Sequence, residues 1–271
     1  MTCTQPDRTR LPSRAGPLAL ATRFARPAAL AAALLAAASG ARAADLVVSA
    51  AASLTNAFKA LAPLYEAAHP GTHVQLNFAA SDALVAQIEK GAPVDVFAAA
   101  DQASMDRADA AHLLAPGTRH DFVANTLVVI TPATSLAPLK SLQDLQQPAI
   151  HRIALGQPSG VPAGRYAKAA LEAAQLWPAL EPKAVYAQNV RQALDYVSRA
   201  EVDAGFVYAT DAATDKDTVR VAFTVATPTP IRYPVAAIAA GPNAAGGRDF
   251  AAFLSTASAQ AVLARFGFTA P

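Results

Sequence analysis

Residues 46–58 read Leu-Val-Val-Ser-Ala-Ala-Ala-Ser-Leu-Thr-Asn-Ala-Phe, an apolar β-branched run followed by small residues and then by a helical pattern. The run 46–48 is typical of a buried strand. Apolar residues at three- and four-residue steps predict a helix over residues 54–69, which Pro70-Gly71 ends. A strand, a tight turn and a helix form the unit from which parallel α/β sheets are built.

The same unit recurs along the chain. We predict further strands at residues 74–78, 94–98, 127–130, 153–155, 184–186, 205–208 and 235–239, and further helices at 82–90, 163–174, 190–199 and 249–266, with Asp101 as the N-cap of one more helix. This alternation favours mostly parallel sheets flanked by helices.

Prolines interrupt the alternation in two places, at Pro132, Pro138 and Pro148 and again at Pro228, Pro230 and Pro234. We therefore expect an α/β protein of two lobes, with residues 44–124 plus 231–271 in lobe 1 and residues 125–230 in lobe 2. Lobe 2 would be inserted into lobe 1, and the two connecting segments would act as a hinge. A single doubly wound domain is the simpler alternative.

The first 43 residues have the order of a secretory signal peptide. Several arginines precede an Ala/Leu run at residues 28–38, and an Ala41-Arg42-Ala43 cleavage site follows. The run is shorter than the ~20 residues of a membrane-spanning helix, which would be the alternative. We expect cleavage after residue 43 and a periplasmic protein. Cys3, the only cysteine, lies in this leader, so no disulfide, thiolate site or lipid-bearing cysteine is expected beyond it.

The charge balance changes once the leader is set aside. The whole chain has 22 basic and 20 acidic residues, of which six and one fall in residues 1–43, leaving 16 and 19. The remainder therefore carries a net charge of −3, and no basic surface for nucleic acid is expected. An anion bound by such a protein must be held by local dipoles.

Four predicted helices begin just after small residues that end a strand. These starts lie at Ser53, at Ser81, at Pro162-Ala163 and at Asn189-Val190. Helix starts present free N–H groups and a partial positive charge, and in parallel sheets they gather where ligands bind. Together they predict an anion pocket. The alternative for each serine is that its hydroxyl only caps its own helix.

The predicted pocket contains hydrogen-bond donors but no positively charged side chain. Ala163 and Val190 would offer backbone amides, and Tyr208 would offer its phenol at the end of a strand, unless it is simply buried and bonded to backbone. Arg165 and Arg191 are expected to point away, and Asp82 to cap its helix. Because a donor-only pocket favours a fully deprotonated dianion, sulfate, molybdate and tungstate remain as candidate ligands.

Catalytic motifs are absent from the sequence. No serine lies in a Gly-x-Ser-x-Gly elbow, no phosphate-binding loop of the Gly-x4-Gly-Lys kind occurs, and the five histidines lack metal-ligand spacing. We expect no enzyme and no cofactor, with a periplasmic enzyme as the competing hypothesis from another class.

The motifs of residues 44–271 resemble, in their joint order and spacing, the periplasmic molybdate-binding proteins of ABC transporters, which are type II periplasmic binding proteins. The resemblance rests on residues 50–57, 78–81, 91–97, 100–102, 125–129, 161–168, 189–191, 205–208 and 265–268.

The resemblance implies a two-lobed fold with the ligand in a cleft between the lobes. It implies molybdate, or tungstate, held by the hydroxyls of Ser53 and Ser81, the amides of Ala163 and Val190, and the phenol of Tyr208. Molybdenum would be bound only as the oxyanion, through these same residues. Sulfate or another small tetrahedral oxyanion is the alternative ligand. The implied partner is a membrane permease, and a monomer is expected.

Overall fold

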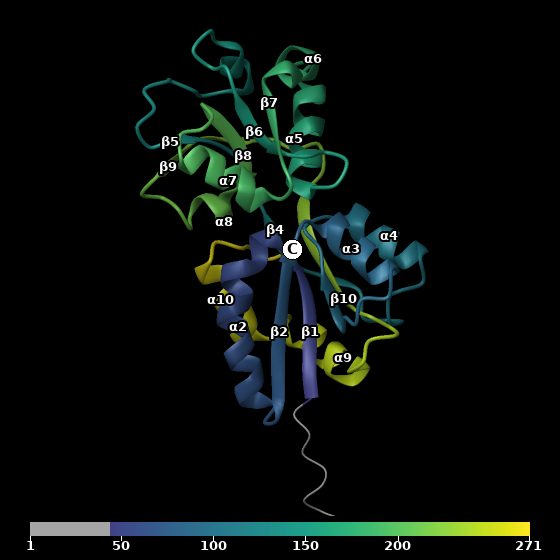
Figure 1. Cartoon of the computed structure of the whole chain (residues 1–271). Helices are drawn as coiled ribbons and strands as arrows, with labels where there is room; N and C mark the ends of the chain where they lie inside the picture. Colours follow the sequence, from purple (N-terminus) through teal and green to yellow (C-terminus); the bar gives the residue numbers. More distant parts are fainter. Residues whose placement is uncertain (1–43) are drawn as a thin grey trace, which may run out of the picture. The chain divides into compact units, whose positions relative to one another are not determined.

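The computed structural model describes residues 44–271, so the predicted signal peptide at residues 1–43 lies outside the described residues. The described chain is an α/β protein of two lobes, each built on a five-stranded sheet flanked by helices (Figure 1). This confirms the predicted fold class. Within residues 44–271, no helix combines the length and the apolar composition that a membrane span requires.

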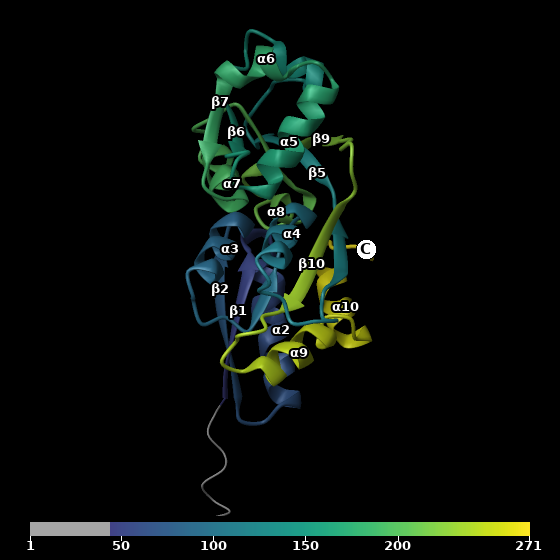
Figure 2. The ribbon, with the colours of Figure 1, turned by 90° about the vertical axis from the view of Figure 1, so that its right-hand side faces the viewer.

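The first sheet has the strand order β2-β1-β3-β10-β4. Four of its five strands run in the same direction, and β10 alone is antiparallel to its neighbours. Figure 2 shows β10 beside the helices of this lobe. The strands and helices of the lobe are β1 (Ala44–Ala51), β2 (Thr72–Ala79), β3 (Val96–Ala98), β4 (His120–Asn125), β10 (Ile231–Ala237), α2 (Thr55–Ala68), α3 (Ser81–Glu89), α4 (Gln102–Ala110), α9 (Ala244–Phe253) and α10 (Ala257–Arg265).

The second sheet has the order β7-β6-β8-β5-β9, and β5 is its one reversed strand. Its strands and helices are β5 (Leu127–Pro132), β6 (Ile153–Gly156), β7 (Ala184–Ala187), β8 (Ala204–Tyr208), β9 (Val219–Val225), α5 (Pro162–Ala173), α6 (Trp177–Leu180), α7 (Val190–Ser198) and α8 (Ala209–Ala212). The strands β6, β7 and β8 are mutually parallel, so α5, α7 and α8 all start at the same edge of the sheet.

The chain passes between the sheets twice. The first connection is Thr126, between β4 and β5, and the second is the segment between β9 and β10. Buried aromatic and aliphatic side chains of both lobes form one hydrophobic cluster. In the first lobe, for example, the ring of Phe58 packs 6.1 Å from those of both Phe122 and Phe250.

Several local predictions were wrong or incomplete. The strands β4 and β9 were not predicted. The strand β10 begins at Ile231 rather than at residue 235 and includes Pro234, which a β-bulge accommodates although proline has no N–H for the ladder. The helix predicted at residues 249–266 is two helices, α9 and α10, because the Thr256 side chain caps the second one by accepting from Ala259 N.

Candidate functional site

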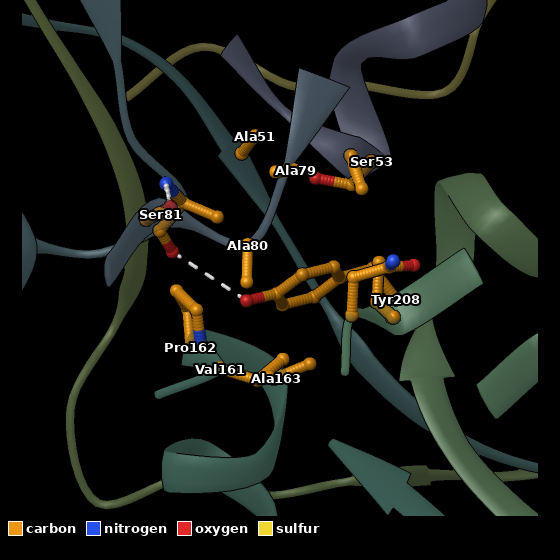
Figure 3. Close-up of a pocket in the computed structure, with 13 residues that line it drawn as sticks. Ala51, Ser53, Ala79, Ala80, Ser81, Val161, Pro162, Ala163 and Tyr208 are labelled. Atoms are coloured by element: carbon orange, nitrogen blue, oxygen red, sulfur yellow. Dashed lines mark hydrogen bonds between the residues drawn. The ribbon is translucent and has the colours of Figure 1, made fainter. Parts of the chain in front are cut away.

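The five residues predicted to bind an anion lie around one pocket (Figure 3). Each is at most 4% exposed. The cavity has a volume of about 10 Å³, far smaller than the roughly 300–1,000 Å³ of pockets for drug-sized ligands, so it excludes ligands of that size. The lining residues are Ala51, Ala52, Ser53, Ala79, Ala80, Ser81, Ala100, Val161, Pro162, Ala163, Asn189, Val190 and Tyr208.

Ser53 does not cap a helix, contrary to one of the two interpretations of the sequence. It lies inside a single 3₁₀ turn, Ala52–Leu54, which leads directly into α2. Its hydroxyl is instead 3.0 Å from the hydroxyl of Tyr233 on β10. The small residues that precede it leave the hydroxyl at the pocket wall.

Ser81 is the first residue of α3, one position after the N-cap Ala80, and it too makes no capping bond. Its hydroxyl oxygen accepts a hydrogen bond from Ala100 N at 3.0 Å. Since a backbone N–H can only donate, the Ser81 proton is left for another acceptor.

The backbone amides come from two helix starts. Ala163 is the second residue of α5, after Pro162, and Val190 is the first residue of α7. Residues in the first turn have no acceptor within their helix for the N–H group. The Asn189 side chain caps α7 by accepting from Gln192 N at 3.0 Å, while Val190 lies in the pocket lining.

Tyr208 ends β8, and Figure 3 shows its phenol reaching toward Ser81 with Pro162 and Ala163 beside it. Its hydroxyl lies 3.5 Å from the carbonyl oxygen of Ala100. Burial raises the pKa of Tyr208 well above its ordinary value, so the phenol keeps its proton and remains a donor at neutral pH.

No lysine or arginine is among the residues that line this pocket. As predicted, Arg165 and Arg191 stay out of it, but both reach the other lobe. Arg165 lies 2.6 Å from Asp101 and from Asp82, so Asp82 pairs with this arginine and does not enter the pocket. Arg191 donates to Asn56 Oδ1 at 2.9 Å.

The sequence did not reveal which residue hydrogen-bonds to the hydroxyl of each pocket serine. Ala100 supplies the N–H that Ser81 accepts and the carbonyl near Tyr208, and Tyr233 contacts Ser53. Ala100 directly precedes Asp101, the predicted N-cap, so its place just after a strand could have been located from the sequence. Tyr233 lies about 180 residues from Ser53 in sequence, and no local pattern marks it.

Metal coordination by side chains has no support in the described region: residues 44–271 contain no group of three or more His, Cys, Asp or Glu side chains that could hold an ion. What the pocket offers is hydroxyl and amide donors from both lobes. Two α/β lobes joined by two segments, with donors from both lobes around one pocket, define a solute-binding protein.

The comparisons with known proteins give the family. The model of the family described as bacterial extracellular solute-binding protein matches residues 46–269, and the chain belongs to this family. Two relatives are molybdate-binding proteins named ModA. The one from Escherichia coli is 38% identical, over 83% of this chain and 88% of that protein. The one from Haemophilus influenzae is 36% identical, over 84% and 91%.

A solved structure agrees with these relatives. The substrate-binding domain of a putative molybdenum ABC transporter from Clostridium difficile superposes with a TM-score of 0.65 at 34% identity, and the match covers 84% of this chain and 99% of that one.

Proposed function

We propose that this protein captures molybdate, or tungstate, and delivers it to the permease of an ABC transporter. The observation that carries the proposal is the meeting of Ser53, Ser81, Ala163, Val190 and Tyr208 in one pocket lined without Lys or Arg. These are the residues that the resemblance assigns to the oxyanion. Two relatives with more than 35% identity are named molybdate-binding proteins.

The donor set fits a dianion. Burying such an ion is tolerable only when its oxygens are hydrogen-bonded, and hydrogen bonds to a charged group contribute about 1.5–3 kcal/mol each. Five donors on several elements can surround a tetrahedral ion, and a helix start adds favourable partial charge to each amide. A protonated anion would need an acceptor for its own proton.

Binding requires the lobes to separate and close again. Because none of the five residues is more than 4% exposed, a ligand reaches them only when the two lobes move apart. We propose that residues 44–124 with 231–271 and residues 125–230 are the moving lobes, hinged at Thr126 and between β9 and β10. The closed form is then the one that a permease recognises.

The proposal includes a place and a mode of action. The protein works as a monomer in the periplasm after loss of residues 1–43, without catalysis and without a cofactor. The family is one of binding proteins, which agrees with this.

Calorimetric titration of residues 44–271 with molybdate, tungstate, sulfate and phosphate tests the proposal. We expect tight binding of molybdate and tungstate, weaker binding of sulfate, and the weakest binding of phosphate. Tighter binding of sulfate than of molybdate would move the assignment to the alternative ligand. Absence of heat with all four would refute the oxyanion site.

A further inference from the structure

The side-chain amide of Asn125, the last residue of β4, has a fixed orientation. The backbone N–H of Thr126 donates to Asn125 Oδ1 at 2.8 Å. An N–H can only donate, so the atom it meets must be the amide oxygen, and the other atom must be the NH₂ group. That NH₂ group lies 2.8 Å from Thr210 Oγ1 and 3.2 Å from the hydroxyl oxygen of Tyr233.

The direction of the next bond follows. Nδ2 of Asn125 is donor-only, so the oxygen of Tyr233 accepts from it, and the Tyr233 proton must point elsewhere. Tyr233 is fully buried, and the other partner of its hydroxyl within the described chain is Ser53 Oγ, at 3.0 Å. Burial raises the pKa of Tyr233 well above its ordinary value, and the nearby charge of Asp211 raises it further. The phenol is therefore protonated and donates to Ser53.

Ser53 then resembles Ser81. In each case a donor from the protein itself occupies one lone pair of the serine oxygen, Tyr233 for Ser53 and the Ala100 amide for Ser81. Each serine therefore keeps its proton free to donate into the pocket, while one of its two lone pairs is already occupied. For Ser81 a backbone N–H alone fixes the direction of the serine proton. For Ser53 the direction depends on the side chains of Tyr233 and Asn125, which are remote in sequence.

We propose that Asn125 and Tyr233 form a one-way hydrogen-bond relay that directs the Ser53 proton toward the pocket and so favours a fully deprotonated oxyanion over a protonated one. The proposal rests on the proposed function of the pocket. Asn125 and Tyr233 are positioning residues: neither lines the pocket, and both act through the Ser53 hydroxyl. Asn125 is the last residue before the first segment that connects the lobes, and Tyr233 is the third residue of β10, which follows the second.

Two variants test the relay in opposite ways. Tyr233→Phe removes the donor, so Ser53 can turn its proton or its lone pairs toward the ligand. Asn125→Asp replaces a donor by an acceptor, so Tyr233 would donate to the new carboxylate, Ser53 would donate to Tyr233, and the lone pairs of Ser53 would face the anion. We expect molybdate affinity to fall about tenfold for Tyr233→Phe and further for Asn125→Asp.

Each variant is also made in a Ser53→Ala background. This control is needed because the carboxylate introduced by Asn125→Asp also repels the anion directly. In that background Tyr233→Phe should have almost no effect, and the remaining effect of Asn125→Asp measures its charge alone. Tyr65→Phe, which removes another buried hydroxyl, one that donates to Gly246 O at 3.3 Å, is the matched control and should keep the wild-type affinity. Melting curves confirm that all variants fold.

Selectivity gives a readout that a purely structural role would not change. With Tyr233→Phe, Ser53 can accept the proton of hydrogen phosphate, so the ratio of molybdate to phosphate affinity should fall. The relay would be refuted if Tyr233→Phe lowered molybdate affinity as much in the Ser53→Ala background as in the wild type. An unchanged ratio of molybdate to phosphate affinity would refute it as well. If instead the wild type binds molybdate but Ser53→Ala binds equally well, the site assignment is what fails.

A measurement without ligand keeps the relay testable in every case. In proton NMR of the wild type we expect a slowly exchanging hydroxyl proton, absent in Tyr233→Phe, whose strongest cross-peaks are to the ring protons of Tyr233. Strongest cross-peaks to the β-protons of Ser53 would show the reverse direction and would refute the proposal.

Discussion

The guanidinium group of Arg165 on α5 holds the carboxylate of Asp101, the N-cap of α4, across the two lobes at 2.6 Å. The Asp101 side chain is only 6% exposed, and the same arginine also lies 2.6 Å from Asp82. Arg165 follows Ala163 by two residues, so the helix start that offers an amide to the pocket also carries this bridge between the lobes.

We expect Arg165→Met to weaken molybdate binding about tenfold, mainly by faster dissociation. When the lobes are together, the variant leaves Asp101 buried without its counter-charge, which is unfavourable. When the lobes are apart, water can solvate the carboxylate, so the closed form alone is penalised. Stopped-flow dissociation rates and calorimetry measure the effect.

Arg199→Met is the matched control. Within residues 44–271, Arg199 pairs with Glu201 of its own lobe, at 4.0 Å, and its side chain is 70% exposed. This variant should bind as the wild type does. Equal dissociation rates for both variants would show that the bridge at Arg165 does not stabilise the closed form.

Ser81→Ala and Tyr208→Phe should both weaken binding but differ in their effect on stability. Removing the Ser81 hydroxyl leaves the Ala100 N–H buried without its acceptor, at a cost of about 1–3 kcal/mol. The contact of the Tyr208 hydroxyl within the described chain is a long one, 3.5 Å to Ala100 O, so its loss should leave the melting temperature nearly unchanged. Thermal melting and titration of both variants check this, and wild-type affinity in Tyr208→Phe would remove that residue from the proposed site.

The fold was predictable where local signals repeat. The strand–turn–helix pattern of residues 46–58 and its later copies gave the class and most strands, because apolar periodicity follows directly from burial. The strands β4 and β9 carry mixed burial, with half-buried residues such as His120 and Phe223, so they lack a clear alternation. The break between α9 and α10 depends on one capping threonine that a periodic apolar pattern conceals.

The pocket was predictable for a related reason. Helix starts can be located in sequence, and parallel strands bring them to one edge. What could not be predicted are contacts between residues far apart in the chain: Tyr233 with Ser53, and Arg165 with Asp101. These depend on how the lobes and the crossing strand β10 are arranged, and no short-range pattern encodes that arrangement.

Asp211 should make the stability of the protein depend on pH. Its carboxyl is fully buried, and burial raises its pKa to about 6 although Arg191 opposes the shift. A pKa above the unfolded value of about 3.9 means that the folded state favours the protonated form. The resulting stabilisation is complete below about pH 4 and is lost as the pH rises through 6.

The free energy of unfolding of the wild type relative to Asp211→Asn should therefore fall between pH 4 and 7, by an amount on the order of 2–3 kcal/mol. Urea unfolding at several pH values measures it. Asp195→Asn, at an exposed position of α7, is the control. The difference in the free energy of unfolding between this variant and the wild type should change much less with pH. A flat difference for Asp211→Asn would contradict the raised pKa.

Gly164 is needed for the close approach of α5 to the end of β6. A Cβ atom at Gly164 would lie 1.8 Å from the carbonyl oxygen of Gly156, and backbone cannot yield as a flexible side chain can. Gly164→Ala must therefore push the start of α5 away and shift the neighbouring Ala163 amide. We expect a stability loss of at least about 1–3 kcal/mol, together with weaker molybdate binding. Gly160→Ala, where a Cβ meets nothing within 4 Å, should change neither property. Retained affinity in a folded Gly164→Ala variant would show that the position of the Ala163 amide does not limit binding.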